Sequence, residues 1–132
     1  MTEVINIDSK GFKALKDYSS WRIAQLGYDE DVNSLDGVKT FGRHLKTDEV
    51  FTLLEGEASI FTAGFTKEFG TIRADKMEKN KIYIVKEKEW HAAVMNPGAK
   101  ILIVENSDTC SSNSDIHELT QEEKIIMKHL RG

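Results

Sequence analysis

Short strand-like runs recur about every ten residues along this chain, and this spacing constrains the fold more than any other feature. The runs are rich in branched and aromatic side chains and end in Gly, Asn, Asp or charged turn residues. The clearest are 21–28, 50–54, 58–62, 82–85, 90–95 and 101–104. Many short strands at this spacing favour an all-β antiparallel sandwich or barrel.

Weaker patterns add further expectations. Residues 4–7 (Val-Ile-Asn-Ile) form a short first strand candidate, and residues 65–77 hold one or two strands around Gly70. The turn signal Glu55-Gly56-Glu57 stands between two strand-like runs and predicts a β-hairpin there.

The C-terminal part has a different pattern. Residues 106–114 are small and polar, which predicts a loop. Thr120 and Glu123 have the spacing of a capping box, and Ile125, Ile126 and Leu130 then give an apolar stripe. We therefore expect one domain over residues 1–132, with a barrel core at about 20–105 and a loop and short helix at about 106–132.

Composition excludes several function classes. The chain has 18 Lys and Arg against 22 Asp and Glu, a net charge of −4. This charge argues against nucleic-acid binding and against a basic patch that would bind a membrane. No apolar run approaches the roughly 18 residues of a membrane span. The single cysteine, Cys110, forms no intrachain disulfide, and the first residues lack a signal-peptide pattern. We therefore expect a cytoplasmic protein.

Two of the four histidines, His44 and His91, lie in strand-like segments. A turn at Thr47-Asp48 reverses the chain after His44 and would bring Glu49 beside it. Glu49, Phe51 and Leu53 share one face of the next strand, and Met95 shares a face with His91.

These residues carry a resemblance to a known family. His44, four residues, Glu49, six residues and Gly56 reproduce most of the first motif of the cupin superfamily, and His91 with the residues after it resembles the second motif. The motifs and their linker cover about residues 37–96.

The sequence also departs from the cupin pattern. Gly42 stands where the first histidine of the first motif is usual. In the second motif, Lys86 and Lys88 replace its Pro and Gly, and Met95 replaces its Asn. Three of the four usual metal ligands remain.

The resemblance implies a small antiparallel β-barrel of cupin type (a double-stranded β-helix, or jelly roll) with a short C-terminal helix. It implies that His44, Glu49 and His91 hold a divalent metal, with Fe, Mn, Ni and Zn as candidates. The function would then be that of a metal-dependent enzyme of isomerase, lyase or dioxygenase type acting on a small molecule. The alternative is a non-catalytic barrel, metal-free or not, that binds or senses a small molecule.

The remaining expectations concern the pocket and the assembly. Phe51, Leu53, Tyr83 and Met95 are candidates to line the pocket, although packing in an ordinary barrel core is the simpler explanation for each. The resemblance also implies a homodimer formed through edge strands, and residues 4–7 are the candidate to pair with or cover such an edge.

Overall fold

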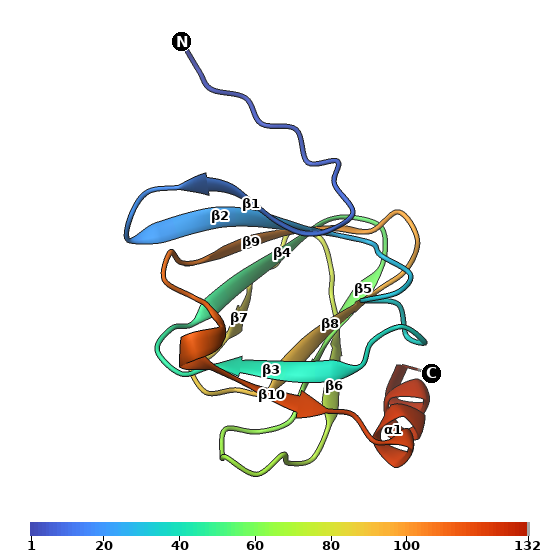
Figure 1. Cartoon of the computed structure of the whole chain (residues 1–132). Helices are drawn as coiled ribbons and strands as arrows, with labels where there is room; N and C mark the ends of the chain where they lie inside the picture. Colours follow the sequence, from blue (N-terminus) through green and yellow to red (C-terminus); the bar gives the residue numbers. More distant parts are fainter. Residues whose placement is uncertain (132) are drawn as a thin grey trace.

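Two five-stranded antiparallel sheets face each other in the computed structural model, which describes residues 1–131 (Figure 1). Sheet A contains, in order, β1 (Gly11–Asp17), β2 (Trp21–Gly27), β9 (Lys100–Asn106), β4 (Glu49–Glu55) and β7 (Tyr83–Val85). Sheet B contains β10 (Ser114–Glu118), β3 (Thr40–His44), β8 (His91–Met95), β5 (Ala58–Thr62) and β6 (Arg73–Lys76). The all-β antiparallel prediction is confirmed.

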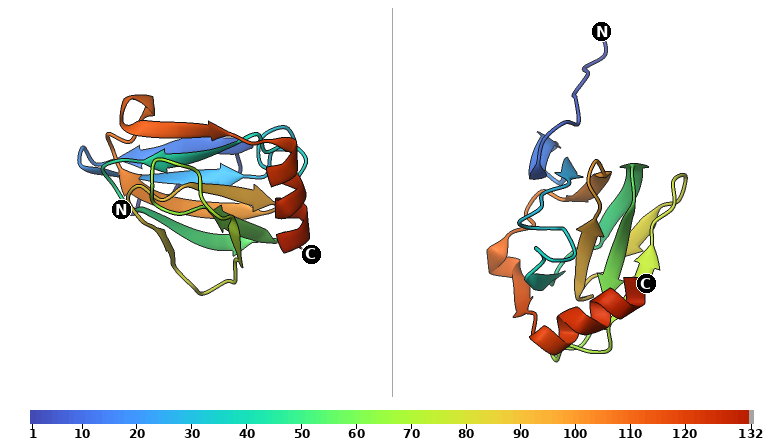
Figure 2. Two further views of the ribbon diagram at one scale, coloured as in Figure 1. Left: turned by 90° about the horizontal axis from the view of Figure 1, so that it is seen from below. Right: turned by 90° about the vertical axis from the view of Figure 1, so that its right-hand side faces the viewer.

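The C-terminal helix α1 (Gln121–Arg131) follows a short 3-10 turn, η1 (Ser111–Asn113), and strand β10. The predicted capping box is present: Glu123 Oε1 accepts from the Thr120 amide at 2.8 Å, and Thr120 Oγ1 accepts from the Glu123 amide at 3.1 Å. The helix lies crosswise along one end of the strands (Figure 2). Its fully buried Met127 fixes it to the core.

Sheet B carries an apolar cluster on each face: one lies between the two sheets, and the other lies on the outer face of sheet B under α1. One contains residues of both sheets, such as Phe51, Ile60 and Ile101, and the other contains Phe41, Phe61, Ala63, Trp90, Val94 and Met127. Alternation along each strand produces this core, since residues two apart point to the same side of a sheet. Among the described residues, no helix is long and apolar enough to cross a membrane.

The prediction of a β-hairpin at residues 55–57 is wrong. Gly56 does form a turn, with φ of +77°, but β4 and β5 belong to different sheets and do not pair. The turn therefore carries the chain from sheet A to sheet B. The local pattern identifies a reversal, whereas the partner of each strand depends on long-range packing.

The strand predicted at residues 4–7 is also absent, and this segment is extended and unpaired. Ile5 and Ile7 lie instead near Leu15, Ile23 and Leu102, around a recess on the outer side of sheet A. Two strands, β1 and β10, lie outside the range 20–105 expected for the barrel core. Their sequences mix polar and apolar residues because each is an edge strand with little burial.

Candidate metal centre

Three predicted ligands converge between the sheets. His44 ends β3 in sheet B, Glu49 begins β4 in sheet A, and His91 begins β8 in sheet B. Glu49 Oε1 lies 2.9 Å from His91 Nε2 and 3.5 Å from His44 Nε2. One donor atom from each residue lies within 4.8 Å of the other two. The turn after His44 thus brings Glu49 beside it, across the gap between the sheets.

Hydrogen bonds orient both imidazole rings. His91 Nδ1 lies 3.0 Å from the Glu89 carbonyl oxygen, which only accepts, so Nδ1 carries a proton. His44 Nδ1 lies 2.8 Å from Ser114 Oγ, whose own proton goes to the Cys110 carbonyl at 2.7 Å. Ser114 Oγ therefore accepts from His44 Nδ1. In both neutral rings the lone pair belongs to Nε2, the atom that faces Glu49.

This arrangement fits a cation. Two Nε2 lone pairs and a carboxylate oxygen converge, and acceptors repel one another unless a proton or a metal ion lies among them. His tautomers fixed by outer hydrogen bonds are typical of metal-ligating imidazoles. Two imidazoles and one carboxylate are a ligand set used for Fe(II), and such sets also suit other divalent transition metals.

Without a metal, a proton provides the positive charge. Burial lowers the pKa of His91, but the Glu49 carboxylate outweighs this and raises it above its usual value. Burial alone would raise the pKa of Glu49, yet hydrogen bonds with His44 and His91 hold it well below its usual range. Glu49 is therefore a buried carboxylate paired with an imidazolium.

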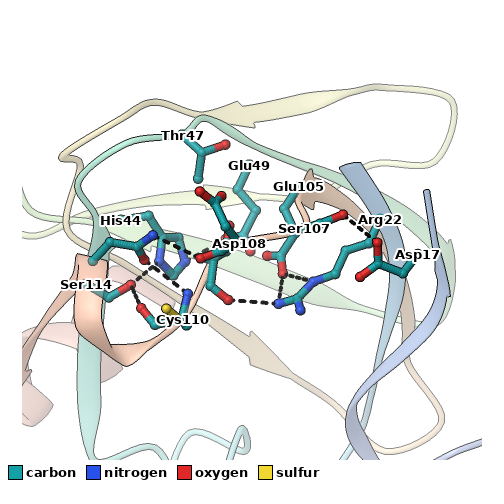
Figure 3. Close-up of polar contacts among 12 residues, drawn as sticks. Asp17, Arg22, His44, Thr47, Glu49, Glu105, Ser107, Asp108, Cys110 and Ser114 are labelled. Atoms are coloured by element: carbon teal, nitrogen blue, oxygen red, sulfur yellow. Dashed lines mark hydrogen bonds and ion pairs between the residues drawn. The ribbon is translucent and has the colours of Figure 1, made fainter. Parts of the chain in front are cut away.

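A second carboxyl group, which the sequence reasoning missed, adjoins this cluster. Glu105 of β9 is 2% exposed in its side chain and accepts from Arg22 Nε at 2.7 Å (Figure 3). Burial and a hydrogen bond with Glu49 raise the pKa of Glu105 to about 8, against the opposing effect of Arg22. Glu105 follows Ile101 and Ile103 at a spacing of two, so the alternation along β9 could have placed it on the inner face.

The cluster opens into a cavity of about 430 Å³. Its apolar walls include Phe12, Leu26, Val32, Val38, Phe51 and Ile103. Of the four predicted pocket residues, Phe51 lines this cavity, whereas Leu53, Tyr83 and Met95 belong to the core cluster and are not among its lining residues. Leu53 and Met95 point to the same side as the ligands but lie further along their strands, whereas Tyr83 pairs with Phe51 from the edge strand β7.

Gly42 also lines this cavity, opposite His91 in the pairing of β3 and β8. A β-carbon at this position would meet its nearest atom, the Asp115 carbonyl oxygen, at 3.7 Å. Position 42, where the fourth histidine is missing, therefore has room for a β-carbon without a clash.

No family model matches the sequence, and no curated protein matches it. Solved structures do resemble the fold. KdgF from Halomonas sp. matches with a TM-score of 0.52 at 8% identity, over 72% of this chain and 76% of that one. A cupin-2 domain protein from Shewanella frigidimarina matches with 0.51 at 17% identity, over 75% and 83%. An RmlC-like cupin from Desulfovibrio desulfuricans matches with 0.52 at 11% identity, over 80% and 92%.

Likeness at such low identity establishes the fold. It agrees with the motif around His44 and Glu49, with the two facing antiparallel sheets and with the short C-terminal helix. The chain is a small protein of the cupin fold.

Proposed function

We propose that this chain is a metal-dependent cupin that binds one divalent ion through His44, Glu49 and His91 and acts on a small molecule in the adjoining cavity. One observation carries the proposal. The Nε2 atoms of both histidines face Glu49 Oε1, while both Nδ1 atoms are engaged by groups outside the cluster.

The metal, when bound, would supply a Lewis acid for a substrate oxygen, the chemistry that isomerases, lyases and dioxygenases of this kind need. Fe, Mn, Ni and Zn are the candidates for this ligand set. The chain itself orients the ligands and surrounds the substrate. Phe51 and Ile103 form an apolar wall next to Glu49, and Gly42 leaves room on the side of His91.

Metal content tests this function directly. We expect elemental analysis of untagged protein, purified without chelator, to find about one equivalent of Fe, Mn, Ni or Zn per chain. H91A and E49A should lose this metal, because each removes one of three ligands. H129A is the matched control, since His129 is exposed on α1. Metal retention by H91A equal to that of the parent would contradict the assignment.

A metal-free binding barrel is the second candidate function. It is favoured by the ion pair between Glu49 and His91, which satisfies both buried groups without a metal. In that case the purified protein holds no metal, gains no thermal stability from any added divalent ion, and is stabilised by a small metabolite bound in the cavity.

We also propose that the chain forms a homodimer. The outer side of sheet A near β7 exposes Ile82, Ile84 and Leu54 by 70%, 55% and 36%. Self-association would remove this apolar surface from water. Light scattering should give the mass of two chains, and I84K should shift it toward one. A monomeric parent would contradict this proposal. The cytoplasmic location stays a prediction.

A further inference from the structure

Three ionisable residues form a row across the inner face of sheet A. Arg22 of β2 is the register partner of Glu105 of β9. The pairing of Val50 with Val104, continued by one residue, sets Glu105 opposite Glu49 of β4. Arg22 donates to Glu105, and Glu105 and Glu49 are both buried neighbours on the same face of adjacent strands. Arg22 and Glu105 thus form a polar extension of the candidate metal centre (Figure 3).

The row is confined to the level of the metal centre. Two residues further along the same strands, the inner row consists of Ala24, Ile103 and Phe51, all buried and apolar. The same three strands therefore pack without charges immediately below. Buried ion pairs contribute little to stability compared with apolar side chains of similar volume, so packing alone gives no reason for this row.

Arg22 is connected to the other side of the centre as well. Its Nη2 donates to the Thr109 carbonyl oxygen at 3.2 Å. The next residue, Cys110, accepts from Ser114 Oγ, which in turn accepts from His44 Nδ1. The guanidinium therefore contacts Glu105, which adjoins one ligand, and the segment that orients a second.

We propose that Glu105, anchored by Arg22, is a positioning residue that fixes the Glu49 carboxylate with Oε1 toward the two histidines, and that this pair sets the affinity and geometry of the metal site. The proposal rests on the proposed metal-binding function. Glu105 lies outside the group of converging donor atoms, so it acts through Glu49 rather than as a ligand. Outer partners of this kind change metal affinity by about 10- to 100-fold in other sites.

Co²⁺ binding to the full chain tests the proposal, with calorimetry for affinity and visible absorption for coordination geometry. We expect E105L to weaken Co²⁺ binding by about 10- to 100-fold and to alter the spectrum. E105Q should restore both, because its amide oxygen accepts from Arg22 while its NH₂ group donates to Glu49. E55Q is the matched control, since Glu55 also lies on β4 and faces Lys100 of β9 at 3.9 Å, but at the surface.

The outcomes separate the two hypotheses. A parent protein that binds no Co²⁺ overturns the metal-binding function and this proposal with it. A parent that binds, together with an E105L variant of equal affinity and identical spectrum, overturns the positioning role alone. If E105L does not fold, as judged by circular dichroism, the Co²⁺ affinity and spectrum of R22M test the positioning role instead. This variant keeps the Glu105 carboxyl but removes its anchor, and unchanged affinity and spectrum in R22M would refute the proposal.

Discussion

Replacing Gly56 with alanine should destabilise the protein more than the same change at Gly64 or Gly98, two other glycines with positive φ. Gly56 connects β4 to β5 with φ of +77°, where an L-residue costs about 1–2 kcal/mol. Its β-carbon would also lie 2.7 Å from Ala99 Cα, a contact with backbone that no side-chain rotation relieves. Overpacking of this kind costs about 1–3 kcal/mol. The expected loss for G56A is therefore about 2–5 kcal/mol.

Two control glycines isolate the contact from the backbone conformation. Gly64 and Gly98 have φ of +81° and +83°, and a β-carbon at either would meet nothing within 4 Å. G64A and G98A should therefore lose only about 1–2 kcal/mol. Urea denaturation followed by circular dichroism measures all three. A G56A variant no less stable than G64A would refute the argument that the crossover from sheet A to sheet B depends on this close approach.

Three other predictions follow from single positions. G42A should stabilise the chain by about 0.5–1 kcal/mol in thermal unfolding, because a strand glycine gains a β-carbon that meets no atom closer than 3.7 Å. G42H should bind Co²⁺ more tightly than G42A, and equal affinity would mean that position 42 does not face the metal. M127A should cost about 2–5 kcal/mol, because Met127 is the fully buried residue of α1; a loss under about 1 kcal/mol in urea would show that the helix is not needed for the core. Burial opposes ionisation of Glu123, but the Thr120 amide and His117 hold its pKa below the usual value. The parent should therefore be more stable than E123Q at pH 7 and lose this advantage as the pH falls below about 4.3, the value in unfolded chains; a difference independent of pH would contradict this.

The positions of most strands followed from local pattern. Each predicted run overlaps an observed strand, because branched and aromatic residues between turn signals suit a half-buried sheet; the runs are 21–28, 50–54, 58–62, 82–85, 90–95 and 101–104. The capping box also predicted where the helix begins. The hairpin at Gly56 failed, since a turn signal does not say whether the chain returns to its own sheet or crosses to the other.

The hydrophobic pattern also did not predict which of the inward-facing residues line the cavity and which lie in the core. Alternation places Leu53 on the same side of β4 as Glu49 and Phe51. It does not say how far along the strand the core ends and the cavity begins. That boundary depends on which residues of the facing sheet fill the space, and here they enclose Leu53 and Met95 but leave Phe51 beside the cavity.

The sequence by itself determined the three candidate ligands, because His44 and Glu49 are separated by one short turn and His91 begins a strand whose motif matches. Only the tertiary structure decided what surrounds them. Arg22 and Glu105 are 83 residues apart, and His44 and Ser114 are 70 apart. Local preferences act over a few residues, whereas contacts at such separations arise from strand pairing between distant segments and from the burial of charge that requires a partner.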